Sequence, residues 1–218
     1  MTRKIVLAGG SGLVGRQAAE FLARDGFEVH LVLRRPSAAS NPLIQEHIAP
    51  STDWPAVVEG IKADVAISCL GTTIRTAGSR DAFRAVDRDL VLAFAQASYQ
   101  AGARRFITVS SVGAVPGSSN FYLKTKAEME QGLRNIGFQR LDIMRPSLLT
   151  GGQRADHRPG EALGILLSPI TDLLMFGPLK KFASTPSSKL AQAIAALANC
   201  HDDGVFIHEN DAIGALAS

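Results

Sequence analysis

Short apolar runs alternate with helical periodicity along the first two thirds of the chain. Lys4–Ala8 and Glu28–Leu33 are short apolar runs that predict strands. Between them, Leu13–Arg24 carries apolar residues at the spacing of a helix. The same pattern then predicts a weak strand at His47–Ala49, a helix at about Pro55–Ile61, strands at Asp64–Leu70, Arg105–Val109 and Gln139–Met144, and helices at Ser79–Gln100 and Phe121–Asn135.

This regular alternation predicts the fold class. Strands that are apolar on both sides and separated by amphipathic helices indicate βαβ units, with a parallel sheet covered on both faces. We therefore expect an α/β, Rossmann-like, doubly wound parallel sheet. Ligands of such sheets bind beyond the carboxyl ends of the strands.

The pattern becomes irregular after Thr150. A loop is expected to about Gly160, then an apolar helical piece at Glu161–Phe176 that Pro169 interrupts. A helix at Leu190–Ala198, a strand at Val205–His208 and a terminal helix at Asp211–Ala217 follow. The stretch contains no linker or repeat, so we expect one domain over residues 1–218, in which about residues 151–218 form a small cap on the substrate side.

Composition and charge exclude several classes of protein. The chain has 218 residues, 46% of them hydrophobic and 20% charged, as expected for a globular protein. A net charge of +3 is too small to indicate nucleic-acid binding. Cys69 and Cys200 are far apart and lack the spacing of metal ligands, which argues against a disulfide scaffold or a metal site. The apolar run at Ile5–Ala8 is too short for a secretory signal, and no stretch is apolar enough for a membrane span. We therefore expect a cytoplasmic protein without a membrane partner, whose oligomeric state stays open.

A glycine-rich segment between the first strand and the first helix carries the strongest chemical signal. It consists of Gly9, Gly10, Ser11, Gly12, Leu13, Val14 and Gly15. Glycines at this spacing permit a tight turn and let backbone N–H groups approach a pyrophosphate at the N-terminus of a helix. The sequence therefore predicts a dinucleotide site here, in preference to a simple turn.

The end of the second strand indicates which dinucleotide binds. An NAD site typically has a carboxylate about 20 residues beyond the glycines, where it binds the ribose 2′-hydroxyl. This chain has Arg34 and Arg35 there instead. Guanidinium groups suit a 2′-phosphate, so we expect NADP(H) in preference to NAD(H).

A serine, a tyrosine and a lysine follow the strand at Arg105–Val109. Ser111 comes just after this strand, and Tyr122 and Lys126 are one helical turn apart if the next helix begins at Phe121. A tyrosine with its ordinary pKa near 10 is a poor base. A lysine ammonium at ~4 Å in an effective dielectric of ~20 stabilises a phenolate by about 4 kcal/mol, or roughly three pKa units. Ser111 would then hydrogen-bond the substrate oxygen. These residues predict hydride transfer to or from a carbonyl, with Ser111, Tyr122 and Lys126 as catalytic residues.

Together, the glycine segment, Ser110-Ser111 and Tyr122…Lys126 resemble the short-chain dehydrogenase/reductase superfamily. Further segments are similar to its atypical branch around the Tat-interacting-protein oxidoreductases. These segments are Cys69–Thr73, Val86–Asp89, Ser118–Phe121 and Arg158–Glu161.

The resemblance implies a Rossmann fold, NADPH binding and an intact Ser–Tyr–Lys set, with Ser111 as the active-site serine in place of Ser110. It also implies that two further segments contact the cofactor: Leu70, Gly71, Thr72 and Thr73, and Arg145, Pro146 and Ser147. It implies no particular substrate.

Two other functions stay open at this point. The chain could be an NADP(H)-binding sensor without turnover, although such relatives have usually lost the tyrosine or the lysine. An epimerase or dehydratase is less favoured, because these enzymes usually carry a larger C-terminal substrate domain. The short remainder of this chain favours a small substrate, and a loop with Arg154, His157 and Arg158 could contact it or be solvated.

Overall fold

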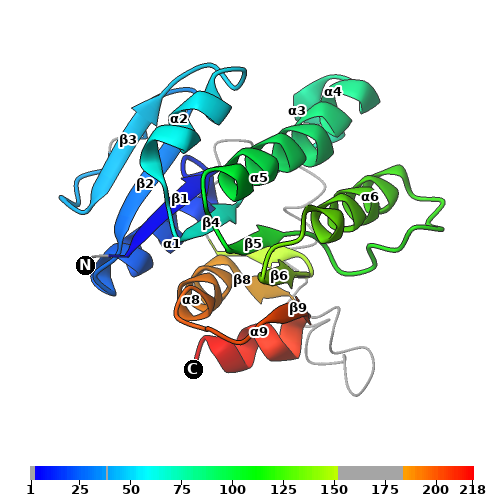
Figure 1. Cartoon of the computed structure of the whole chain (residues 1–218). Helices are drawn as coiled ribbons and strands as arrows, with labels where there is room; N and C mark the ends of the chain where they lie inside the picture. Colours follow the sequence, from blue (N-terminus) through cyan, green and yellow to red (C-terminus); the bar gives the residue numbers. More distant parts are fainter. Residues whose placement is uncertain (1–2, 38, 152–183) are drawn as a thin grey trace.

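The protein is built on one seven-stranded parallel sheet. The computed structural model describes residues 3–37, 39–151 and 184–218. In this part of the chain the strand order is β3-β2-β1-β4-β5-β6-β9, and every neighbouring pair is parallel (Figure 1). The predicted α/β, Rossmann-like, doubly wound fold is confirmed.

Most bounds of the elements are close to those expected, but the strand expected at His47–Ala49 lies at Ile44–Ile48, and the single helix expected at Ser79–Gln100 is interrupted by a π-helical segment. The sheet contains β1 (Lys4–Ala8), β2 (Glu28–Leu33), β3 (Ile44–Ile48), β4 (Val65–Ser68), β5 (Arg105–Val109), β6 (Arg140–Met144) and β9 (Gly204–His208). The helices are α1 (Leu13–Arg24), α2 (Trp54–Ile61), α3 (Ile74–Ala77), α4 (Arg80–Arg84), the π-helical segment η1 (Ala85–Leu90), α5 (Val91–Gln100), α6 (Phe121–Ile136), α8 (Ser187–Leu197) and α9 (Asn210–Leu216). A separate two-stranded sheet pairs β7 (Leu149–Thr150) with β8 (Thr185–Pro186).

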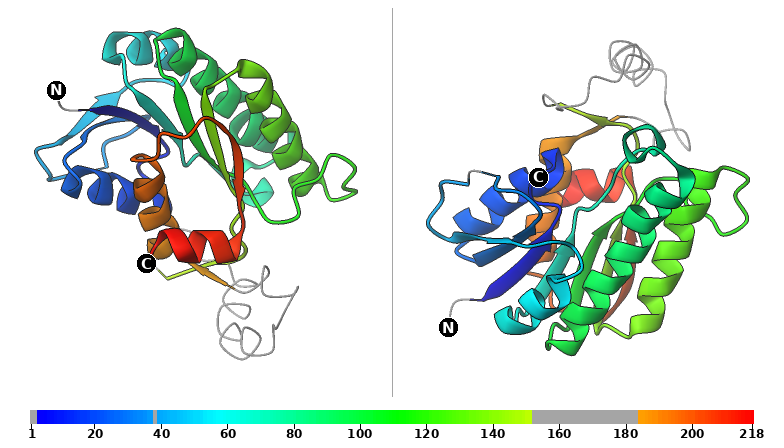
Figure 2. Two further views of the ribbon diagram at one scale, coloured as in Figure 1. Left: turned by 60° about the horizontal axis from the view of Figure 1, so that its bottom comes forward. Right: turned by 90° about the horizontal axis from the view of Figure 1, so that it is seen from above.

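Helices cover both faces of the sheet, as Figures 1 and 2 show. Alternate residues of each central strand point to opposite faces, so Ile5 and Leu7 belong to one apolar cluster and Val6 and Ala8 to the other. The first cluster is closed by α1, α8 and α9, and the second by α2, α5 and α6. Because both faces are buried, the central strands β1 and β4 are largely apolar.

The C-terminal part of the chain contributes to the main domain. β9 pairs with β6 and extends the sheet, and α8 shares a buried cluster with α1 through residues such as Leu190 and Leu22. The described part of the segment that we expected to be a cap therefore lies within the layered domain. Residues 152–183, with the expected helical piece Glu161–Phe176, lie outside the described residues, so the substrate-side cap stays a prediction.

The parallel sheet gathers the predicted site at one edge. The loops that follow β1, β4, β5 and β6 begin at Gly9, Cys69, Ser110 and Arg145, and these four strands are neighbours in the sheet. Strand order reverses between β1 and β4, which is where nucleotides bind in doubly wound sheets. In the described part of the chain, no helix is both long and apolar enough to cross a membrane.

A pair of histidines joins β2 to β3. His30 Nδ1 is 2.9 Å from His47 Nε2, and His30 Nε2 is 3.0 Å from Glu28 Oε1. Since the carboxylate only accepts, His30 donates from Nε2 and accepts from His47 at Nδ1. Burial lowers the pKa of both imidazoles, although Glu28 opposes this shift at His30. Both rings are therefore neutral in the folded protein near neutral pH.

This pair predicts a loss of stability in mild acid. Below the ordinary histidine pKa of about 6.5, the unfolded chain binds protons at these histidines more readily than the folded protein does. The free energy of unfolding therefore falls as pH decreases, with a slope of at most about 1.4 kcal/mol per pH unit for each extra proton. Urea unfolding over roughly two pH units around that pKa measures the slope. His30→Gln should flatten it and the exposed His201→Gln should leave it unchanged; equal slopes in all three proteins would contradict the assignment.

Candidate active site

The glycine segment forms a tight turn that a side chain would disrupt at two positions. Gly9 has a φ of +87°, and a Cβ there would lie 2.5 Å from the Cys69 carbonyl carbon. A Cβ on Gly15 would lie 2.3 Å from the Gly9 carbonyl oxygen. These glycines let β1, the loop after β4 and the first turn of α1 approach one another closely.

The first turn of α1 is open to an anion. Its N-cap is Gly12, and within the described chain no side chain caps this end and no acidic residue occupies the first turn. Ser11 and Gly12 are exposed, and the Gly12 N–H donates to the Gly9 carbonyl at 3.0 Å, whereas the first N–H groups of the helix itself have no acceptor within the helix. A helix N-terminus of this kind suits a pyrophosphate, so Gly9, Gly10, Ser11, Gly12, Leu13, Val14 and Gly15 fit the predicted dinucleotide.

Arg34 and Arg35 directly follow β2 and are exposed. Among the described residues, neither forms an ion pair or a side-chain hydrogen bond that would hold it away from a ligand. The loop after them is ordered by Glu46, whose carboxylate accepts from Ser37 Oγ at 2.5 Å and from the Ala39 N–H. The Ser37 hydrogen bond is the main cause that lowers the pKa of Glu46.

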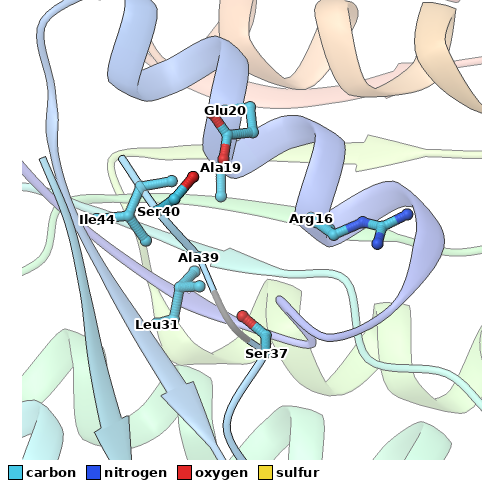
Figure 3. A pocket seen from close by; sticks show the side chains of 8 residues that line it. All are labelled: Arg16, Ala19, Glu20, Leu31, Ser37, Ala39, Ser40 and Ile44. Carbon is cyan, nitrogen blue, oxygen red and sulfur yellow. The ribbon is translucent and has the colours of Figure 1, made fainter. Parts of the chain in front are cut away.

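A small cavity lies beside this loop, between α1 and the segment that leads to β3. Its volume is about 110 Å³, and it is lined by Arg16, Ala19, Glu20, Leu31, Ser37, Ala39, Ser40 and Ile44 (Figure 3). None of the predicted catalytic residues lines it. Its lining residues come from α1, β2, β3 and the loop between the two strands, so it lies on the α1–β2 side of the sheet.

The tyrosine and the lysine are positioned by α6. Asn120 caps the helix by accepting the Leu123 N–H at 3.3 Å, so Tyr122 and Lys126 lie one turn apart near its start. Tyr122 packs against Phe83 with ring centroids 5.6 Å apart. Ser111 is half-buried after β5, and among the described residues its hydroxyl donates only to the Val112 carbonyl, at a long 3.3 Å. Its weak partner leaves this hydroxyl able to turn to a substrate oxygen.

Lys126 forms a buried ion pair with a carboxylate. Lys126 Nζ lies 2.7 Å from Asp87 Oδ1, and the two side chains are 4% and 1% exposed. Burial alone would lower the pKa of Lys126, but Asp87, with smaller contributions from Tyr122 and Glu130, raises it above its ordinary value. Lys126 is therefore a permanent ammonium with an anionic partner.

The loop after β4 is tied to the same carboxylate. The Thr72 N–H donates to Asp87 Oδ2 at 2.8 Å, and Leu70 is packed against the apolar cluster under α5. Thr73 is the N-cap of α3 and accepts the Thr76 N–H at 3.0 Å. Gly71 is exposed at the tip of the loop.

Ser110 and Arg145 are engaged by a second buried carboxylate, Glu130 of α6. Ser110 Oγ donates to Glu130 Oε1 at 2.6 Å, and Arg145 makes a bidentate pair with both oxygens at 2.9 and 2.6 Å. Hydrogen bonding to Glu130 raises the pKa of Arg145. These side chains link the segments after β5 and β6 to α6, and they engage Ser110 but not Ser111.

The loop after β6 is fixed in a similar way. The Pro146 carbonyl accepts the Val112 N–H at 3.0 Å, which joins this loop to the one after β5. The Ser147 N–H donates to Thr185 Oγ1 at 3.2 Å. The arginines and histidine expected near the substrate, Arg154, His157 and Arg158, lie outside the described residues.

Cys69 does not contribute a nucleophile. Burial raises the pKa of its thiol to about 12, so it stays protonated at neutral pH. The part of the chain that the structure covers also holds no group of three or more side chains arranged as metal ligands.

Asp87 and Glu130 are the two residues of this site that the sequence reasoning did not select. Glu130 follows Tyr122 and Lys126 at a spacing of four residues, so it lies on the same buried side of the helix. An acidic residue at a position predicted to be buried is the sequence feature that could have identified it. Asp87 has a weaker signal, because it lies in a charged stretch between Arg84 and Asp89 that resembles a solvated helix face.

Comparison with known proteins decides the family. The family described as NAD(P)H-binding matches residues 9–164, from the glycine segment through the loops described above. The chain belongs to this NAD(P)H-binding family.

Relatives of this NAD(P)H-binding protein place it more narrowly. Protein FMP52-1, mitochondrial, of Scheffersomyces stipitis is 33% identical over 85% of this chain and 80% of its own. Protein HTATIP2 of Rattus norvegicus is 44% identical over 46% of this chain and 40% of its own. A Bacillus halodurans structure assigned to the NAD-dependent epimerase/dehydratases has 21% identity, covers 99% of this chain and 98% of its own, and has a TM-score of 0.70. The resemblance to the atypical short-chain dehydrogenase/reductase branch is confirmed, and the last likeness shows the fold.

The expected cytoplasmic location is wrong for this family. The FMP52 relatives from Coccidioides immitis, Scheffersomyces stipitis and Emericella nidulans are named mitochondrial. The sequence argued only against a secretory signal and a membrane span. Mitochondrial proteins need neither feature, so these absences do not indicate the cytoplasm.

Two helical glycines give opposite predictions for the same substitution. Gly15→Ala places a Cβ against backbone that cannot move easily, so we expect a loss of about 1–3 kcal/mol of stability together with dinucleotide binding. Gly60, exposed in α2, has nothing within 4 Å of the place that a Cβ would take, so Gly60→Ala should gain up to about 1 kcal/mol. Urea unfolding and dinucleotide titration measure both. A stable, binding-competent Gly15→Ala protein would show that the tight turn is not required.

Proposed function

We propose that this protein is an NADP-dependent oxidoreductase that transfers a hydride between NADPH and a small carbonyl or hydroxyl substrate. The observation that carries the proposal is the placement of Tyr122, Lys126 and Ser111. Ser111 follows β5, and Tyr122 and Lys126 belong to the first turns of the next helix, α6; β5 ends at the sheet edge where the glycine turn fits a dinucleotide. The NAD(P)H-binding family supports the coarser part of this proposal.

Each residue has a role that follows from its position. The Ser111 hydroxyl donates to the substrate oxygen, and the Tyr122 hydroxyl gives a proton to that oxygen or takes it back. The Lys126 ammonium stabilises the phenolate that forms at Tyr122. The reduced nicotinamide supplies the hydride. The turn at Gly9–Gly15 and the loop at Leu70–Thr73 hold the dinucleotide in place.

The choice of NADP(H) rests on Arg34 and Arg35. Both guanidinium groups are exposed after β2, and no carboxylate stands in this position to bind a ribose 2′-hydroxyl. The nearby cavity is lined by Arg16 and Glu20 of α1, whose charges are opposite, so the excess positive charge comes from Arg34 and Arg35. A 2′-phosphate would compensate this local charge.

Cofactor preference tests this choice. The protein should bind NADPH more tightly than NADH, and Arg34→Ala with Arg35→Ala should weaken NADPH binding at least about tenfold while NADH binding changes little. Isothermal titration calorimetry measures all four affinities. Arg134→Ala, an exposed arginine on α6, is the control and should keep the preference. Equal affinity for the two dinucleotides in the unaltered protein would refute the assignment.

Turnover on a panel of small aldehydes and ketones tests the chemistry. NADPH consumption should be observed with some members, and Tyr122→Phe should lower kcat by about 10²–10⁴-fold while NADPH affinity is retained. Tyr99→Phe, the other tyrosine of the chain, should leave the rate unchanged. Undiminished turnover in Tyr122→Phe would remove this residue from the mechanism.

One observation favours a second candidate, an NADP(H)-binding sensor without turnover. Asp87 neutralises Lys126, which reduces the electrostatic help that Tyr122 receives. Tight NADPH binding without consumption on any member of the panel would support the sensor. Saturable consumption that Tyr122→Phe abolishes would exclude it.

A further inference from the structure

Asp87 occupies an unusual position for a carboxylate. It is 1% exposed and lies in the π-helical segment η1, which interrupts the helical stretch from α4 to α5. π-Helical turns are rare and occur frequently at functional sites. Asp87 is the buried residue of this segment, whereas Asp89, two positions later, is half-exposed and pairs with Arg88.

The two oxygens of Asp87 have different partners. Oδ1 pairs with Lys126 Nζ at 2.7 Å, and Oδ2 accepts the Thr72 N–H at 2.8 Å. A Cβ added to Gly71 would be 3.6 Å from Oδ1, so the loop passes directly over the carboxylate. One side chain therefore contacts both the predicted catalytic lysine and the predicted cofactor loop.

The other charged groups near Lys126 do not replace Asp87. On α6, Lys126 faces Tyr122 and Glu130, and Glu130 already holds Arg145 in a bidentate pair. The guanidinium groups of Arg84 and Arg88, from α4 and η1, pair with Glu128. Asp87 is thus the carboxylate that directly balances the ammonium.

We propose that Asp87 is a positioning residue that sets the base strength of Tyr122 by neutralising Lys126 and that holds the Gly71–Thr72 loop over the site. This inference rests on the proposed function for the roles of Tyr122 and Lys126. The ion pair reduces the stabilisation of the Tyr122 phenolate relative to an unpaired ammonium. It also fixes Lys126 and the Gly71–Thr72 loop relative to one another before any ligand binds.

The two tasks of Asp87 can be separated by substitution. Asp87→Asn keeps an oxygen that can accept the Thr72 N–H but removes the charge beside Lys126. Asp87→Ala removes both. The charge should act on the ionisation of Tyr122, and the hydrogen bond should act on dinucleotide binding.

Tyrosine ionisation can be observed without cofactor or substrate. The chain has two tyrosines, so in a Tyr99→Phe background the phenolate absorbance belongs to Tyr122 alone. In this background Asp87→Asn should move the midpoint of the absorbance titration to lower pH by about one unit or more, because the ammonium is then unpaired. The matched control, Asp89→Asn, removes the same charge from the exposed face of η1 and should leave the midpoint in place. An unchanged or higher midpoint in Asp87→Asn would overturn the proposal.

Dinucleotide affinity, measured by calorimetry, tests the loop. Asp87→Asn should bind NADPH within about threefold of the parent, and Asp87→Ala should bind at least about fivefold more weakly, since it loses one charge-assisted hydrogen bond. Equal affinities of the two variants would contradict the role in holding the loop. The absorbance titration needs no turnover, so a shifted midpoint in a protein without carbonyl reduction would support this inference and refute the proposed function.

A buried lysine without a partner can prevent folding, so a second variant is needed. Asp87→Asn with Lys126→Met removes both charges together and leaves no unpaired ion. If the pair is neutralising, the Tyr122 midpoint in this double variant should stay within about half a pH unit of the Tyr99→Phe parent. A midpoint more than about one unit away would show that Asp87 does not balance Lys126.

Discussion

Close backbone contacts at the glycine turn fix the geometry of the cofactor edge. Gly9 contacts the Cys69 carbonyl, and Gly15 contacts the Gly9 carbonyl, at distances that exclude any Cβ. These contacts set β1, the loop after β4 and the start of α1 relative to one another. The open helix N-terminus, the arginines after β2 and the serine after β5 reach a common edge because the sheet between them is parallel and closely packed.

Two buried carboxylates organise the other side of that edge. Glu130 joins Ser110 to Arg145, and Asp87 joins Lys126 to the Thr72 amide. Because each carboxylate has cationic and neutral donors, the cost of burying its charge is compensated within the site. The side chains that we propose contact the substrate, Ser111 and Tyr122, are not bound by either carboxylate.

The fold was predictable from sequence because apolar periodicity reports burial directly. The parallel sheet, the glycine turn at Gly9–Gly15 and the helix that carries Tyr122 and Lys126 follow from local patterns. The buried partners do not, because Asp87 meets Lys126 only after two helices pack, and its neighbours Arg88 and Asp89 are typical of a solvated face. The pairing of β9 with β6 is also a long-range contact, which the local pattern at Val205–His208 predicted as a strand without indicating its neighbour.

Helix α8 and strand β9 have a consequence for how the chain folds. The apolar face of α1 is covered by α8, which lies near the other end of the sequence, and β9 pairs with a strand that precedes it by a long stretch of chain, as its register with β6 shows. Contacts so distant in sequence slow folding. During synthesis, the first βαβ units must wait with an uncovered apolar surface until the C-terminus is released. A chain truncated before α8 would keep this apolar surface exposed.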